Sequence, residues 1–445
     1  MPITWTTEQV LALSPDANST KNGKSLANLS KWQTLGCTDN VTWGECKGSG
    51  KKPYRTQIDL TEPAFRCSCP SRKFPCKHAL ALFLLLAGQV DSFTEHSPPD
   101  WVQEWLGKRS QTTQKKQEKQ TATLTDPAAR AKRAEKREAK IQAGLVDLDL
   151  WLRDLIRQGL ATAQSQPYSF WDQPAARMVD AQAPALARRL REMASLPHGS
   201  TSWPSRLLAE LGQLHLLIQG YQRQETLPEV VVEELRSQLG WTQKQEELLA
   251  TAKQPKSGIE TVRDTWSVLG LRTFEEDNLR VQRVWLQGSQ GRSALILSFA
   301  YGSNPIDVSL IPGTALKADL VFYPGLYPLR ALVQNRGEAK SFSTGHGATV
   351  ADAMTAYGSA MAQNPWLLEF PLLLQDVVPC LQDSELYLRD LDGHQLSVSS
   401  SFTKQWEMLA FSGGHPLTLM GEWNGQTLFP LSVWAEDRFM ALGAQ

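Results

Sequence analysis

The sequence predicts an α+β multidomain protein: a small N-terminal ββα-like unit held by clustered Cys and His side chains, an all-α middle domain and a β-rich C-terminal domain. Three observations support this prediction. Three Cys and one His lie within residues 67–78, apolar residues recur at helical spacing from about residue 145, and β-type runs follow residue 265. The predicted parts are 1–106, a basic and partly helical linker over 107–140, a helical domain over 141–262 and the β-rich domain over 263–445.

Length and composition limit the class of protein. The chain has 445 residues, 41% of them hydrophobic, and a formal net charge of zero, as expected for a globular protein of two or three domains. Its longest apolar run, near residues 80–87, is much shorter than the roughly 20 residues of a membrane span. No targeting segment follows Met1, and six Cys in so long a chain are not a disulfide scaffold, so we expect a reducing cytoplasm and no membrane contact.

The clearest chemistry lies in the first domain, where Cys67 and Cys69 are followed by Cys76 and His78. Alternate residues of an extended segment face one side, so the first pair can face one ion, while the second pair stands at the entrance of an apolar helix. Three thiolates and one imidazole are the donor set of a closed, tetrahedral Zn²⁺ site. Four basic neighbours favour thiolate over thiol: Arg66, Arg72, Lys73 and Lys77.

Other interpretations explain fewer of these residues. A disulfide between Cys67 and Cys69 would close a very tight ring, and a catalytic Cys–His pair would account for only two of the four side chains. The sequence therefore predicts structural zinc on all four, with no catalytic residue. Cys37 and Cys46 fit small buried thiols, and Cys46 stays open as an alternative ligand.

Around this site the pattern predicts strands over 40–46 and 54–60, joined by a Gly-rich, basic hairpin loop. Residues 107–125 contain almost no apolar side chains and mark a domain boundary. Asp126 and Pro127 then start a helix. Between residues 108 and 140, eleven Lys or Arg face four acids, so this segment is strongly basic and the rest of the chain is acidic.

The middle domain is predicted to be helical. One apolar stripe follows three- and four-residue steps along the first helix: Leu145, Leu148, Leu152, Leu155, Ile156 and Leu160. Further helices are expected over 175–194, 204–221 and 228–252. Gly and Pro separate them, which favours a small bundle or short helical array.

The last domain is predicted to be rich in strands. Short strands are expected over 280–286, 293–301, 307–311, 318–322 and 385–388. Two longer runs around Asn424 and Gly425 predict a hairpin with a type I′ turn. One helix is expected over 349–364, with Thr349 as its N-cap.

The spacing Cys-x-Cys, short loop, Cys-x-His before an apolar helix resembles the SWIM-type zinc finger, and residues 63–78 with 43–54 look like the form found in a group of bacterial SWIM proteins. The resemblance covers about residues 30–90. It implies a zinc module that binds DNA or proteins, with Cys67, Cys69, Cys76 and His78 as ligands. It also implies a multiprotein system, because such relatives are often encoded beside an AAA+ ATPase and a von Willebrand A domain protein.

Two functions remain open from the sequence. The first is a zinc-stabilised interaction protein that assembles with other proteins. The second is a DNA-binding protein that uses the segment 108–140 together with basic residues of the finger: Lys47, Lys51, Lys52, Arg55, Arg72, Lys73 and Lys77. We favour protein assembly, because a neutral chain with an acidic remainder would repel DNA over most of its surface. No enzyme is expected, since the sequence contains no Walker A, Gly-x-Ser-x-Gly or His-Glu-x-x-His motif.

Overall fold

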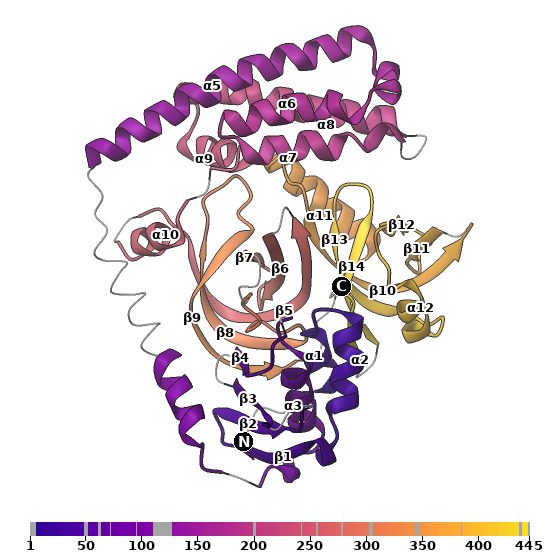
Figure 1. Ribbon diagram of the computed structural model, residues 1–445. Coiled ribbons are helices and arrows are strands. Elements are labelled where there is room, and N and C mark those ends of the chain that lie inside the picture. Colours follow the sequence, from indigo (N-terminus) through magenta and orange to yellow (C-terminus); the bar gives the residue numbers. More distant parts are fainter. Residues whose placement is uncertain are drawn as a thin grey trace.

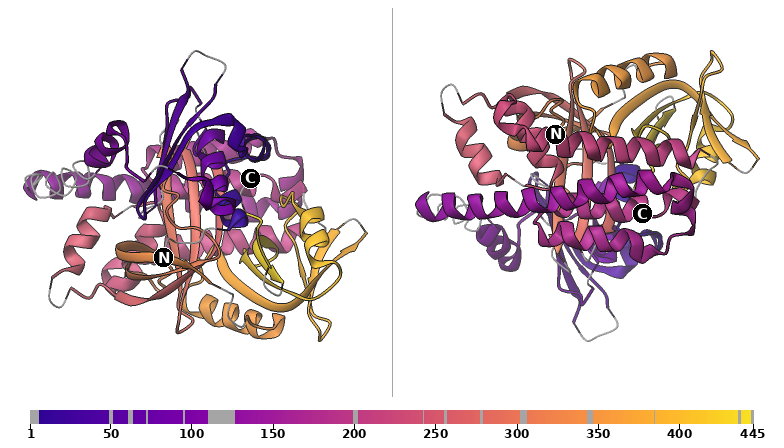
Figure 2. Two further views of the ribbon diagram at one scale, coloured as in Figure 1. Left: turned by 90° about the horizontal axis from the view of Figure 1, so that it is seen from below. Right: turned by 90° about the horizontal axis from the view of Figure 1, so that it is seen from above.

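The chain folds into an N-terminal domain, a helical bundle and a C-terminal β-body, as seen in a computed structural model (Figure 1). The structure describes residues 6–443 except 49–51, 61–63, 72, 95, 110–126, 199–201, 242, 255–256, 277–278, 302–305, 343–346, 384 and 436–437. The bundle and the N-terminal domain lie at opposite ends of the β-body, as the views from above and below agree (Figure 2). The α+β multidomain prediction is confirmed.

The N-terminal domain is an antiparallel four-stranded sheet with helices packed against it. Its elements are α1 (Thr7–Ala12), α2 (Ala17–Leu26), β1 (Trp32–Cys37), β2 (Val41–Cys46), β3 (Tyr54–Asp59), β4 (Ala64–Cys67), α3 (Lys77–Gly88) and a helix over 100–109. The helix α3 buries every residue from His78 to Leu85, so it is the centre of this small core. The expected strands are β2 and β3, and β1 and β4 extend them into a full sheet.

The middle domain is a bundle around a long helix. Its helices are α5 (Pro127–Gln158), α6 (Tyr168–Asp180), α7 (Pro184–Met193), α8 (Trp203–Gln222) and α9 (Glu229–Gln238), followed by α10 (Gln245–Ala252) against the β-body. Residue 140 lies inside α5, which starts at the expected Pro127. Four leucines of the predicted stripe are buried, but Ile156, in the last turn of α5, is 46% exposed.

The first half of the β-body is a closed five-stranded barrel in the order β5-β6-β7-β9-β8. Its strands are β5 (Thr261–Glu276), β6 (Leu279–Gly288), β7 (Ser293–Tyr301), β8 (Thr314–Phe322) and β9 (Arg330–Ser341). A register shift between Val268 and Gly270 bends β5, so one half pairs with β8 and the other with β6. At this bend a Cβ on Gly270 would lie 2.7 Å from Leu431, so the second sheet can pack closely.

The second half is a six-stranded sheet in the order β12-β11-β10-β13-β14-β15. Its elements are α11 (Val350–Gln363), β10 (Phe370–Gln382), β11 (Glu385–Arg389), β12 (Gln395–Ser397), α12 (Gln405–Ser412), β13 (Leu417–Trp423), β14 (Leu428–Ala435) and β15 (Arg438–Ala441). Thr349 caps α11 as predicted, accepting the Asp352 N–H at 3.1 Å.

Two local predictions were wrong. Residues 307–311 form no strand; instead Val308 and Ile311 enter the core of the N-terminal domain. The hairpin turn is shifted by one residue, because the Asn424 N–H donates to the Thr427 carbonyl and Gly425 has φ of 90°. Gly therefore occupies the first central position, as in a type II′ turn, and not the second as in the predicted type I′ turn.

The three parts are joined by buried contacts. The Gln9 side-chain amide donates to the Gly313 carbonyl at 3.0 Å, linking α1 to the barrel. The indole of Trp366 enters the bundle core and donates to the Gln213 carbonyl at 3.1 Å. Between barrel and sheet, the buried Glu422 carboxylate meets Arg283 at 2.8 Å. Among the described helices, none has the length and hydropathy needed to cross a lipid bilayer.

Candidate metal centre

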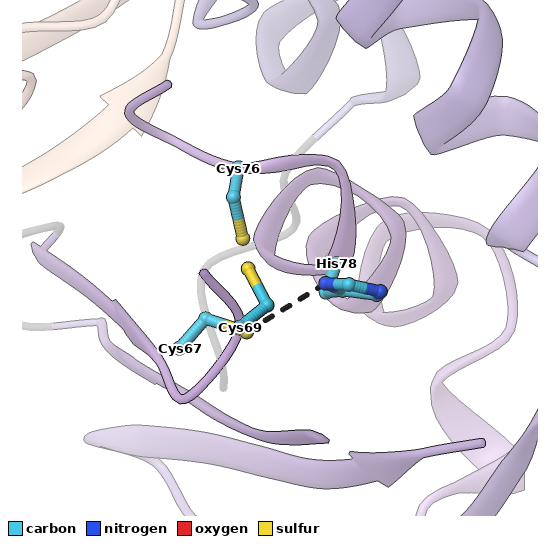
Figure 3. A group of neighbouring side chains, drawn as sticks. All are labelled: Cys67, Cys69, Cys76 and His78. Carbon is cyan, nitrogen blue, oxygen red and sulfur yellow. Dashed lines mark hydrogen bonds between the residues drawn. The ribbon is translucent and has the colours of Figure 1, made fainter. Parts of the chain in front are cut away.

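The four predicted ligands converge between the sheet edge and the start of α3. The ligand atoms of Cys67, Cys69, Cys76 and His78 all lie within 4.8 Å of one another. Figure 3 shows the three sulfur atoms and the imidazole directed at a common point, with the two pairs entering from opposite sides. The sequence therefore predicted correctly that these four side chains meet.

The local fold explains how each side chain reaches the site. Cys67 ends β4 and pairs with Thr56 of β3 across the ladder, and the Ser68 N–H donates to the Arg55 carbonyl at 2.9 Å. These bonds hold the first pair beside the sheet. Cys76 is the extended N-cap residue of α3, and His78 lies in the first helical turn. One helix start therefore supplies both later ligands.

The geometry fits a single Zn²⁺ ion. With Zn–S near 2.3 Å and Zn–N near 2.05 Å, a tetrahedron places sulfur and nitrogen about 3.6 Å apart. The observed distance from Cys67 Sγ to His78 Nδ1 is 3.7 Å. Cys76 and His78 are 5% and 4% exposed, so water has little access to this side of the cluster. Cys67 and Cys69 are partly exposed, and four N and S donors without an open position are typical of a structural site.

Backbone hydrogen bonds to the three sulfur atoms favour the thiolate over the thiol. Backbone N–H groups donate to each of them: Cys69 to Cys67, Ser71 to Cys69, and Ala79 to Cys76. Contacts among the thiols, first with Cys67, lower the pKa of Cys69 and raise that of Cys76. Neighbouring thiolates repel each other, so ionisation of one thiol opposes ionisation of the next. A divalent cation removes this conflict, and the donor set therefore fits zinc.

Of the nearby residues, Lys73 has a different partner from the one expected, whereas Cys46 is a buried thiol as predicted. Lys73 pairs with Asp16 at 2.6 Å, and Arg72 lies outside the described residues. Cys46 is fully buried, its thiol donates to the Lys47 carbonyl at 3.7 Å, and its sulfur is not one of the four clustered ligand atoms. Burial raises the pKa of Cys46 to about 11, as expected for a packed thiol.

Two contacts of this site were not found from the sequence. The Thr56 hydroxyl donates to Cys67 Sγ at 3.2 Å, and the Tyr54 ring packs on the His78 ring with centroids 4.8 Å apart. The register of the hairpin between β3 and β4 is the signal that would have placed Thr56 opposite Cys67.

A second group of possible ligands lies in the turn between β11 and β12, formed by Asp390, Asp392 and His394. Asp390 accepts the His394 N–H at 2.8 Å, and the other two side chains are exposed. The turn itself explains why these residues are close.

Comparison with known proteins agrees with this geometry. Residues 54–87 match the family model of the SWIM zinc finger, and residues 136–239 match that of the SWIM-associated four-helix bundle domain. Searches of curated proteins and of solved structures find no match.

Fold and site thus define a zinc-binding protein whose finger is a domain of sheet and helix. The second matched segment contains most of the bundle and is a domain associated with SWIM zinc fingers, so it narrows the class from zinc-binding proteins to this kind of finger protein. The chain is a SWIM-type zinc finger protein. Such fingers are zinc-binding modules found in protein or DNA interaction.

Proposed function

We propose that this protein is a cytoplasmic, non-enzymatic assembly factor that binds other proteins, and that Cys67, Cys69, Cys76 and His78 hold a structural Zn²⁺. The ion fixes the end of β4 against the start of α3. A small domain has a small hydrophobic core, and a bound metal ion adds stability and rigidity to it. Binding surfaces then lie on the finger, the bundle and the β-body.

One observation supports protein binding over DNA binding: most of the described basic side chains that would contact DNA already have partners within the protein. Most of those described already contact carboxylates, carbonyls or aromatic rings: Lys47 with Ser30, Arg55 with Glu45, Lys73 with Asp16, Lys108 with Glu104, Arg109 with Asp59, and Arg137 with Trp241. Each exposed pair is weak, but a phosphate would have to displace a protein partner. These contacts reduce the positive potential that attracts DNA.

The outer surface of the bundle supports the same proposal. Asp149 of α5 and His215 of α8 lie 2.9 Å apart and join the two helices. Large aliphatic side chains on these helices are 46–58% exposed: Val146, Leu150, Ile156, Leu208 and Leu216. Exposed apolar side chains can be buried by a protein partner and contribute nothing to phosphate binding.

DNA binding is the alternative. Lys51, Arg72 and the stretch 110–126 of the basic segment lie outside the described residues, and Lys136 and Lys140 of α5 are exposed. Fluorescence anisotropy with a labelled 30-base-pair duplex at low salt tests it. We expect no saturable binding. Tight binding whose log K falls with log salt at a slope of about −0.9 per phosphate contact would favour DNA instead.

Protein assembly is tested by affinity purification from the native host. A Leu150→Glu, Leu208→Glu variant is compared with the wild type, and Gln158→Glu, an exposed change on α5, is the matched control. We expect proteins in near-stoichiometric amount with wild type and control, and their loss with the double variant. Equal recovery from all three would refute a role for this surface. The AAA+ ATPase and von Willebrand A domain partners stay a prediction from the resemblance.

A further inference from the structure

Thr56 lies at the centre of the finger sheet and is fully buried. It pairs with Gly44 of β2 on one side and with Cys67 of β4 on the other. Its hydroxyl donates to Cys67 Sγ at 3.2 Å, so a polar group that burial would otherwise penalise is directed at a ligand sulfur. Cys67 thus receives a side-chain donor in addition to the Cys69 N–H.

The negative charge of the zinc–thiolate group explains why a hydrogen bond to Cys67 would be stabilising. A Zn²⁺ ion with three thiolates and one neutral imidazole carries a net charge of about −1 in a mostly buried position. Hydrogen bonds to a thiolate disperse that charge, and bonds to ionised acceptors are roughly twice as strong as neutral ones. Partners that hydrogen-bond to ligands also fix the direction of the ligand atom.

We propose that Thr56 is a positioning residue of the zinc site, whose hydroxyl fixes the direction of the Cys67 sulfur toward the other three ligands. This inference rests on the proposed ligand set. A β-branched residue suits this place, because its stiff side chain holds the hydroxyl in one direction within the strand. Valine has the same shape and a high preference for strands, so Thr56→Val removes the hydroxyl with little change in packing.

Thr42 provides a matched control. It is also fully buried, on the neighbouring strand β2, and its hydroxyl donates to the Gly36 carbonyl at 3.1 Å, not to a sulfur. Thr42→Val therefore removes an equivalent buried hydroxyl from the same sheet. A loss that merely reflects sheet stability would affect both variants alike.

The test measures zinc affinity of the full-length protein by competition with a chromophoric chelator. We expect Thr56→Val to weaken zinc binding about 10- to 100-fold, as is usual when such a partner is removed, and Thr56→Ser to restore it. Thr42→Val should stay within about twofold of the wild type. If Thr56→Val fails to fold, Thr56→Ala is used in the same assay.

A spectroscopic measurement separates positioning from stability. In the cobalt-substituted protein, the sulfur-to-cobalt charge-transfer band should move to lower energy in Thr56→Val, because Cys67 then donates more charge, and should stay in place in Thr42→Val. Wild-type affinity and an unmoved band in Thr56→Val would overturn the proposal, as would equal losses in both valine variants. If instead Cys76→Ser, His78→Ala retains zinc, the ligand set itself is wrong, which is a separate result.

Discussion

Replacing Trp366 tests whether the bundle and the β-body are held together by one buried side chain. Trp366 follows α11, is 5% exposed and packs within the bundle core, where its indole N–H donates to Gln213. A buried Trp removes about 150–250 Å² from water, which at about 25 cal/mol/Å² is worth about 4–6 kcal/mol. We expect Trp366→Ala to make docking of the bundle on the β-body less favourable by about 4 kcal/mol, and Trp366→Phe by about 1–2 kcal/mol.

Hydrogen exchange in α8, read by mass spectrometry, measures this effect directly. A docking loss of about 4 kcal/mol would speed exchange of buried amides in α8 up to about a thousandfold, since 1.4 kcal/mol is a factor of ten. Trp406 is the matched control, because it is 65% exposed on α12, and Trp406→Ala should change exchange in α8 little. If the two alanine variants gave similar rates in α8, the docking role of Trp366 would be refuted.

Three further predictions concern the metal, packing and pH. Metal analysis should find one zinc per chain, and Cys76→Ser with His78→Ala should lose it; full zinc content in that variant would contradict the ligand assignment. In the bundle, Gly212→Ala should raise the free energy of unfolding by about 0.5–1 kcal/mol, because its Cβ meets nothing within 4 Å, whereas Gly144→Ala should lower it by about 1–3 kcal/mol, because its Cβ would lie 2.5 Å from a side chain at the end of α6; urea unfolding should separate the two. Hydrogen bonds from an arginine on β5 and an asparagine on β9 lower the pKa of Asp319 to about 2 from 3.8, so its stabilising contribution is present above about pH 4 and is lost toward pH 2. The stability difference between wild type and Asp319→Asn should therefore shrink over that range, and a constant difference would contradict the assignment.

The metal site could be predicted from sequence because its chemistry is local. All four ligands fall within residues 67–78, so the spacing between them carries most of the geometry. Thr56 could not be found in the same way, because its contact depends on which residue of β3 stands opposite Cys67. Register is set by the whole hairpin, whose connection lies at 61–63, outside the described residues.

Tertiary contacts explain the expectations that failed. Val308 and Leu310 alternate with polar residues as in a strand. In the fold, however, Val308 packs into the core of the N-terminal domain and Leu310 into that of the barrel, so the segment is buried without a strand partner. At the last hairpin, the Asn424 side chain accepts the Gln426 and Thr427 N–H groups, which moves the turn by one residue. A local sequence pattern predicts that a segment is buried or that it turns. Whether it forms a strand, and where the turn begins, depends on the residues that it contacts.

The contact between α1 and the barrel has a consequence for biosynthesis. Gln9 and its acceptor Gly313 are 304 residues apart in the chain, and Ile306 completes the core of the N-terminal domain beside Val308 and Ile311. At about 5–20 residues per second, a ribosome needs roughly 15–60 s to make that interval. During this time the finger is outside the ribosome with part of its apolar surface uncovered. A zinc ion bound at this stage would join the end of β4 to the start of α3 before the barrel covers the rest of that core.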